Sequence, residues 1–442
     1  MMRTAAQQQS GRATSSSAEG APEGHPPERT RRNLLVIAIY QVIARTGWIF
    51  KTETIIMPAV LDAVADAGFL RGMLPVLARF GQSLPPLVVA GPLARMPLKK
   101  WALVTTTLAV ALCFGLLAIA WSLFAGGHPF LLAGIYLTIY AIFAVCNGLN
   151  LLVMATLHGK LIPVASRGRL MVLSTTVGSV TAIAAAIVLL GPWLEAGESA
   201  FDKIFLATAV FFAVAAVVPL MINEPPTLLE RDTSPTQPTA SLRAAVQSWR
   251  EMLAADHGLA RLCLVATFFS VALFLFPHYQ AFARDRLGTQ LPSLLTWVVV
   301  QNVATGLASV IAGPATDRRG TRIVLVVLMA CSGLTPLVVV VLSLLPHATA
   351  GQLFWLVYVP LGINPILMRT FSNAALELAP DLATQPRYVS LVGVALAAPF
   401  VVSPFVGSLV DLIGFRPVFL GGAGVIGLGV AAAIGLPEPR ER

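Results

Sequence analysis

Two short stretches of the sequence match one another and decide how the chain is organised: residues 313–322 read GPATDRRGTR, and residues 91–100 read GPLARMPLKK. Each stretch begins with a Gly-Pro pair after a long apolar segment and carries basic residues just before the next apolar segment. A second match joins residues 148–156 to residues 362–370, where Gly, Asn, Met and Thr recur at the same spacing. Because matching features fall at corresponding places, the chain is predicted to consist of two similar halves.

The apolar segments around these stretches are long enough to cross a membrane. Of the 442 residues, 56% are hydrophobic and 12% are charged, whereas soluble domains carry about 25% charged residues. Apolar runs of about 20 residues recur along the chain, and each can span ~30 Å of hydrocarbon. The sequence therefore predicts an all-α membrane protein with twelve transmembrane helices in two pseudo-symmetric six-helix bundles. The predicted spans are residues 34–61, 70–93, 101–124, 130–157, 168–193, 201–222, 259–283, 292–314, 321–345, 351–378, 386–411 and 415–436.

The remaining segments define the predicted domain organisation. Residues 1–32 are polar and low in complexity, so we expect a disordered tail before a first bundle at 33–222. The linker at 223–258 includes a stripe of apolar residues at helical spacing, which predicts an amphipathic helix that lies on the membrane surface or binds a partner. A second bundle at 259–436 and a short tail at 437–442 complete the chain.

The distribution of charge predicts the topology. Most of the 30 lysines and arginines fall on one side of the predicted spans, whereas Asp62 and Asp66 fall in loops on the other side. Because basic residues favour the cytoplasmic side, both termini are predicted to be cytoplasmic, in a bacterial inner membrane. The same bias accounts for the formal net charge of +9 without a nucleic-acid partner. We expect a monomer that is embedded in the lipid bilayer.

The second of the two matching loops resembles the loop motif of the major facilitator superfamily, G-x-x-x-D-R-x-G-R-[RK]. Thr321 stands where that motif has a basic residue. The resemblance implies the fold of that family and a secondary transporter that works by alternating access, with the acid and the basic residues of the loop latching the inner gate. The matching residues are Gly313, Asp317, Arg318, Gly320 and Arg322.

The first loop is a weaker copy of the same motif. It keeps Gly91 and the basic pair Lys99 and Lys100, but Arg95 stands where the family has the acid. A latch in the first half must therefore use different contacts.

Polar residues in the first span form a stripe that is a candidate substrate site. Gln41, Arg45 and Trp48 recur at helical spacing, with Glu53 at the edge of the stripe. Arg45 lies roughly 16 Å into the helix, near the centre of the bilayer. A guanidinium there can bind a carboxylate or phosphate bidentately, and Trp48 could cover an apolar or cationic part of a ligand. The alternative is an Arg45–Glu53 or interhelical ion pair that only holds the helices together.

A second arginine, Arg369, falls inside the tenth span. The resemblance implies that spans 1, 4, 7 and 10 line the substrate path, so Arg369 could face Arg45 across it. Asn150 and Asn364 occupy equivalent positions in the two halves and could add hydrogen bonds. Arg79, in the second span, is predicted to pair with Glu53 or a helix-end carbonyl. These arginines favour a small organic anion or zwitterion as substrate.

The candidates for coupling to protons or sodium are Glu53, Glu377 and His278, because a buried carboxyl group or an imidazole can titrate near neutral pH. Glu377 fits a salt bridge at the gate equally well, and His278 fits an interface anchor. Lys51 is predicted to point away from the Arg45 stripe and to extend toward the membrane surface.

Other classes of protein find little support in the sequence. No nucleophile–base pair, metal-ligand cluster or phosphate-binding loop is present, so we expect no enzyme activity, no metal and no cofactor. The G-x-G-x-x-G at 422–427 lies inside an apolar span without a preceding strand. Two alternatives stay open: an exporter of amphipathic, drug-like or lipid-like compounds, and a non-transporting membrane receptor or scaffold of the same fold.

Overall fold

The structure, a computed structural model, describes residues 27–226, 242–381 and 384–438, and all regular secondary structure in these ranges is helical. The first half contains α1 (Pro27–Ile49), α2 (Ile56–Val64), α3 (Gly68–Arg95), α4 (Lys100–Phe124), α5 (Pro129–Leu161), α6 (Val164–Ala185), η1 (Ala186–Leu190), α7 (Gly191–Glu195), η2 (Glu198–Ala200), α8 (Phe201–Val217) and η3 (Val218–Met221). The second half contains α9 (Leu242–Ala255), α10 (His257–Phe274), α11 (Phe276–Leu287), α12 (Ser293–Arg319), α13 (Thr321–Leu342), α14 (His347–Leu353), η4 (Phe354–Val357), α15 (Tyr358–Leu361), α16 (Asn364–Leu378), α17 (Gln385–Ala397), η5 (Ala398–Val402), α18 (Ser403–Ile413) and α19 (Phe415–Ile434).

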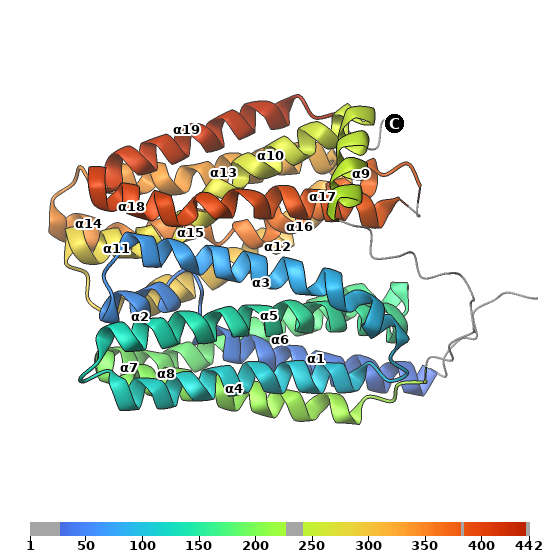
Figure 1. Cartoon of the computed structure of the whole chain (residues 1–442), viewed down its shortest axis with the longest axis horizontal. Helices are drawn as coiled ribbons and strands as arrows, with labels where there is room; N and C mark the ends of the chain where they lie inside the picture. The colour runs from blue at the N-terminus through green and yellow to red at the C-terminus, as the bar shows by residue number, and fades with distance from the viewer. Residues whose placement is uncertain (1–26, 227–241, 382–383, 439–442) are drawn as a thin grey trace, which may run out of the picture.

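The helices form two bundles that lie side by side along a common long axis (Figure 1). One bundle is built from α1 to α8 and the other from α10 to α19. Helix α3 runs along the boundary and packs against α18 of the other bundle. Helices α2, α11 and α14 lie at one end of the molecule, which we call the α2 end, and α9 lies at the opposite end, which we call the α9 end.

Ten stretches of the described residues are helices long and apolar enough to cross a membrane. The first two predicted spans are not among them, for identifiable reasons. The first helix is interrupted after Ile49 and carries charged residues around the break, whereas α3 carries Arg71, Arg79 and four prolines. Both still run alongside the other ten in Figure 1 and complete the twelve-helix arrangement. The protein is a multi-pass membrane protein.

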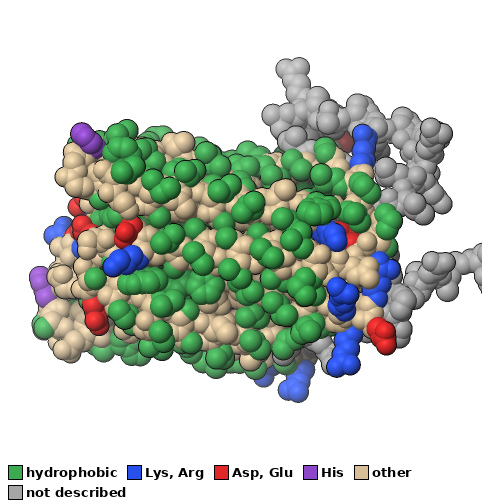
Figure 2. Space-filling model, turned by 90° about the horizontal axis from the view of Figure 1, so that it is seen from below, with side chains coloured by type: hydrophobic (Ala, Val, Ile, Leu, Met, Phe, Trp, Pro, Cys, Tyr) green, Lys and Arg blue, Asp and Glu red, His purple; other side chains and the backbone are tan. Residues whose placement is uncertain are grey.

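The surface matches a lipid environment. Hydrophobic side chains cover the flank of the molecule in Figure 2, and Lys and Arg side chains gather at the end from which the grey residues extend. Along α4, Leu112, Ile119 and Leu123 are each more than half exposed. Apolar side chains along a helix flank find a favourable environment in hydrocarbon, where helices satisfy their own backbone groups.

The first helix breaks between Ile49 and Ile56, and this break corrects the prediction for Lys51. Residues 50–55 form turns in which the carbonyl of Thr52 accepts bonds from the N–H groups of Ile55 and Ile56. An unbroken helix would point Lys51 away from Arg45, but the turn carries the lysine inward. Lys51 is fully buried, so the prediction that it extends toward the membrane surface is wrong.

At the α9 end of the first half, Glu224 takes the place of the acid that the 91–100 loop lacks. Its two carboxylate oxygens accept the backbone N–H groups of Lys99 and Lys100 at 2.9 and 2.8 Å, at the start of α4. Its Oε1 also lies 2.6 Å from Lys160 Nζ. Because a carboxylate is favourable at a helix N-terminus, an acid from the end of the sixth span fixes the loop between the second and third spans.

The 313–322 loop in the second half uses Gly320 and Thr321. Gly320 adopts φ +86 between α12 and α13, a conformation that glycine adopts readily. The hydroxyl of Thr321, which replaces the usual basic residue, donates to Glu377 at 2.6 Å. The side chain of Asp317 lies outside the described part of the chain, so the latch expected from it stays a prediction.

The predicted amphipathic helix of the linker corresponds to α9, which lies across the direction of the bundle helices (Figure 1). On its apolar face, Trp249, Met252 and Leu253 are partly buried and pack against the hydrophobic core. The described part of this face therefore contacts the protein itself.

Candidate functional site

Ion pairs join the two halves at the α2 end. Arg71 of α3 donates from Nε to Asp62 Oδ1 at 2.5 Å and from Nη2 to Asp66. Arg284 of α11, in the other half, donates to Asp66 at 2.6 Å and lies 3.5 Å from Asp62 Oδ2. We call these four residues the α2-end cluster, in which two guanidinium groups are balanced by two carboxylates.

The surroundings of Asp66 show how strongly the cluster holds its charges. Partial burial raises the pKa of this carboxyl group, but the hydrogen bond and charge of Arg284, together with Arg71, outweigh burial. The pKa of Asp66 is therefore held below its ordinary value. Asp66 stays ionised at neutral pH and remains a partner for both arginines.

Close backbone packing seals the same end of the molecule. Gly68 at the start of α3 touches Gly407 of α18, and a Cβ added to either glycine would collide with the carbonyl oxygen of the other. Asp411 of α18 accepts a hydrogen bond from the N–H of Gly68 at 2.8 Å. A carboxylate from the second half thus caps a helix of the first half.

A cavity of about 870 Å³ lies between the halves. It extends from Thr54, in the break of the first helix, toward His158 and Leu170 near the α9 end. Thr54 donates to Gln301 of the other half at 2.7 Å, next to the closed α2 end. The polar and charged lining residues, with Trp48, are Tyr40, Gln41, Arg45, Trp48, Thr52, Glu53, Thr54, Asn147, Asn150, His158, Ser174, Thr175, Gln301, Asn302, Thr305, Ser309 and Arg369.

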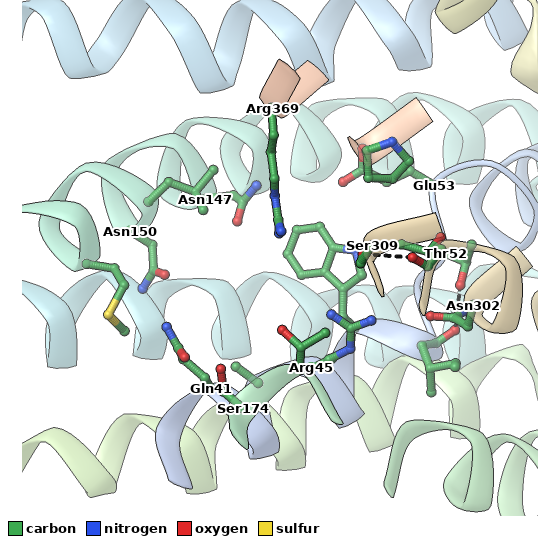
Figure 3. A pocket seen from close by; sticks show the side chains of 18 of the residues that line it. Gln41, Arg45, Thr52, Glu53, Asn147, Asn150, Ser174, Asn302, Ser309 and Arg369 are labelled. Atoms are coloured by element: carbon green, nitrogen blue, oxygen red, sulfur yellow. Dashed lines mark hydrogen bonds between the residues drawn. The ribbon is translucent and has the colours of Figure 1, made fainter. Parts of the chain in front are cut away.

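Arg45 and Arg369 enter this cavity from different halves (Figure 3). Within the described residues, neither guanidinium makes an ion pair or hydrogen bond, and Arg45 Nε is buried without a partner. The two groups are near enough for the charge of one to act on the other. The methylene groups of Arg45 pack on Gly178, where an added Cβ would lie 2.9 Å from Arg45 Cδ. Two like charges therefore share the cavity without a carboxylate bound to either.

Glu53 is paired with Lys51 instead of with Arg45 or Arg79. The ammonium of Lys51 lies 2.9 Å from Glu53 Oε1, 3.1 Å from the centroid of the Trp48 ring and 4.1 Å from that of Phe143. The Arg45–Glu53 pair that the sequence left open is not formed. Arg79 lies over the ring of Phe400 at 5.3 Å and donates to Met368 Sδ at 3.7 Å, so the predicted pairing of Arg79 with Glu53 is not formed either.

The amides of the two halves differ in their relation to the cavity. Asn150 lines it, but its side chain is bonded to Tyr40 and to the threonines of α4. Asn364 is not among the lining residues, and its Oδ1 accepts from Ser332 of α13 at 2.7 Å. Asn147, which was not predicted to bind substrate, lines the cavity, is 5% exposed and has an unpartnered Nδ2.

The remaining predicted residues lie at three separate places. Gln41 lines the cavity and is bonded to His158 at 3.0 Å. His278 is fully buried in α11, and neither ring nitrogen has a partner among the described residues. Glu377 is exposed at the α9 end, bonded to Thr321. Of the three coupling candidates, Glu53 alone lines the cavity.

Two features of the site were missed by sequence reasoning. Asp62 and Asp66 served only as markers of topology, although their short spacing from Arg71 was a signal for a local ion pair. Asn147 lies one turn before Asn150 on α5, and that spacing was the available sign that both amides share a face.

This arrangement of two six-helix bundles around a shared cavity is the major facilitator superfamily fold. A mutant of the nucleoside transporter NupG matches with a TM-score of 0.69 and 10% identity, covering 92% of this chain and 99% of that chain. A D-xylose–proton symporter matches with a TM-score of 0.66 and 14% identity, covering 92% and 99%.

A third similar structure is a POT family transporter in complex with 5-aminolevulinic acid, with a TM-score of 0.63, 15% identity, and coverage of 91% and 95%. No protein-family model and no curated protein sequence matches the chain. Among the described residues, no group of three or more His, Cys, Asp or Glu is placed to hold a metal ion.

Proposed function

We propose that this protein is a secondary transporter that moves a small organic anion or zwitterion across the membrane by alternating access. The observation that carries the proposal is the pair of arginines, Arg45 and Arg369, that enter one cavity from opposite halves without a counter-charge. Unpaired charges inside a membrane protein are costly and mark functional sites. An acidic group bound between them would join the two halves through the substrate.

The two ends of the molecule support an alternating-access mechanism. The α2-end cluster and the Gly68–Gly407 contact close one end, while the cavity extends toward the other. Opening the α2 end would require Arg284 to leave Asp62 and Asp66. In this proposal the α9 end, where basic side chains gather, faces the cytoplasm of a bacterial inner membrane.

In the same proposal Glu53 is the coupling group for a proton or sodium ion. It lies in the cavity wall, where it forms an ion pair with Lys51. Gln41, Trp48 and Asn147 would surround the substrate. Asn150 and Asn364 would position the helices that carry it, because their side chains are already bonded to neighbouring helices.

The similar structures support a transporter in general terms. Those proteins are named as a nucleoside transporter, a proton symporter of D-xylose and a POT family transporter bound to 5-aminolevulinic acid. Their substrates differ widely, so the substrate class proposed here rests on the charges of the cavity.

The test is the melting temperature of the purified protein in detergent, measured with butyrate, succinate, methyl phosphate, glycine and the hydrophobic cation tetraphenylphosphonium. A ligand that binds only the folded state raises the melting temperature by mass action. We expect at least one of the anions or glycine to do so for the wild type and for Arg319→Gln, an exposed arginine at the α9 end. Arg45→Gln and Arg369→Gln should abolish the shift.

Stabilising probes are then tested for uptake into proteoliposomes. Uptake that depends on Arg45 and Arg369 supports the transporter. Stabilisation by the hydrophobic cation alone would overturn the anion site in favour of the exporter of amphipathic compounds. Binding without any uptake would overturn the transporter in favour of the receptor or scaffold.

A further inference from the structure

The charges around the cavity indicate how many charges the substrate carries as well as their sign. Among the described lining residues, the arginines are Arg45 and Arg369 and the one carboxylic acid is Glu53. Glu53 is already neutralised by Lys51, which lies 2.9 Å away and is fully buried. Two positive charges are therefore left without compensation among the described lining residues.

The two charges are carried by different halves of the protein. Arg45 belongs to α1 and Arg369 to α16, and Figure 3 shows them reaching into the cavity from opposite sides. The unpartnered Nδ2 of Asn147, which is 5% exposed, offers a further donor on the side of Arg369. The cavity thus presents donors and positive charge at two places.

Closure of such a cavity removes water from whatever charges remain inside. A buried charge without a partner is far more costly than an exposed one. A monoanion would leave one arginine uncompensated, and a zwitterion would leave the net charge of the cavity unchanged. A ligand with two negative charges would neutralise both guanidinium groups before closure.

We propose that the substrate is a small organic dianion, with one negative charge placed at Arg45 and the other at Arg369. This inference rests on the proposed function and narrows its substrate class. The Lys51–Glu53 pair sets the number of charges that the ligand must carry, because Lys51 cancels the one acid in the wall. Lys51 is held in place by the ring of Trp48 at 3.1 Å as well as by Glu53.

The test uses three four-carbon ligands that differ in charge: succinate, butyrate and 4-aminobutanoate. Their affinities for the purified protein are measured by calorimetry at pH 7 and constant ionic strength, with methyl phosphate as a second kind of dianion. We expect succinate to bind about tenfold or more tightly than butyrate, and 4-aminobutanoate to bind most weakly. The comparison of succinate with methyl phosphate separates a dicarboxylate from a phosphate monoester.

Variants of Lys51 and Glu53 give a sharper test. Lys51→Met leaves Glu53 uncompensated and lowers the positive charge of the cavity by one, so the preference for succinate over butyrate should fall to near unity. The double variant Lys51→Met/Glu53→Gln removes both charges and should restore the wild-type preference. Glu53→Gln alone adds one net positive charge and should strengthen succinate binding; it tests the inference even if Lys51→Met does not fold.

Equal affinity for butyrate and succinate, with both lost in Arg45→Gln, would overturn the dianion and leave the proposed anion site intact. Tightest binding of 4-aminobutanoate would overturn the dianion in favour of a zwitterion. If the wild-type protein binds none of these ligands, the result would instead count against the proposed function itself. A preference for succinate that Lys51→Met does not change would overturn the role given to the Lys51–Glu53 pair.

Discussion

Two pairs of arginines, each with one member in either half, differ in their partners. At the α2 end, Arg71 donates to Asp62 at 2.5 Å and Arg284 donates to Asp66 at 2.6 Å. In the cavity, Arg45 and Arg369 have no acid bound to them among the described residues. The paired arginines link the two halves of the protein, whereas the unpaired arginines are the ones that we propose bind the substrate.

The largest loss of stability should come from breaking the buried ion pair between Arg71 and Asp62. Asp62→Asn leaves Arg71, which is 2% exposed, without its buried counter-charge. Removing one partner of a buried ion pair costs about 3–5 kcal/mol. Chemical unfolding in detergent should show this loss. The matched change Asp66→Asn, at a carboxylate that is 57% exposed, should cost far less; equal losses would show that burial does not govern the cluster.

A smaller effect should follow from separating the backbones that close the α2 end. Gly407→Ala forces α18 away from Gly68, which should cost about 1–3 kcal/mol, as other overpacked sites do. Spin labels placed at the exposed positions 69 and 405 should report a longer distance across the seal. Gly393→Ala in α17, where an added Cβ meets nothing within 4 Å, is the control. An unchanged distance in Gly407→Ala would contradict the proposed closure.

Replacement of the cavity arginines should affect stability in the opposite way to replacement of the arginines of the α2-end cluster. Arg45→Gln and Arg369→Gln remove one of two like charges that act on each other, so stability without ligand should stay within about 1 kcal/mol of wild type or rise. The melting temperature in ligand-free buffer measures this. A loss as large as that of Asp62→Asn would mean that these arginines are structural.

Much of this comparison follows from the sequence, and the rest depends on packing. The matching loops and apolar runs predicted the two bundles, and helical spacing placed Gln41, Arg45 and Trp48 on one face. The position of Lys51 could not be predicted in this way, because the helix ends at Ile49 and the following turn contacts residues far away in the sequence, Gln301 through Thr54 and Phe143 through Lys51.

The pairing of charges was also beyond the reach of local patterns. Arg284 is 218 residues from Asp66, and only the packing of the two halves brings them together. Likewise, Glu224 reaches the first loop from 124 residues away to bind the N–H of Lys100. Asn364 was expected in the cavity from its match with Asn150, but the cavity lining does not include it.

The smallest effect concerns pH. The pKa of Asp66 lies below its ordinary value in the folded protein, so ionised Asp66 contributes stability at neutral pH. That contribution should be constant above about pH 5 and should be lost as the pH falls below about 4, through the folded-state pKa. The difference in melting temperature between wild type and Asp66→Asn should therefore shrink in acid. A difference that grows as the pH falls would contradict the assigned direction.

The most direct test of the two kinds of arginine is one set of melting curves for Arg71→Gln, Arg284→Gln, Arg45→Gln and Arg369→Gln, with and without succinate. We expect the first two variants to melt at lower temperature but to keep the shift caused by succinate. The other two should melt near the wild-type temperature and lose that shift. The reverse pattern, in which the cavity variants keep the shift and the α2-end variants lose it, would contradict the account.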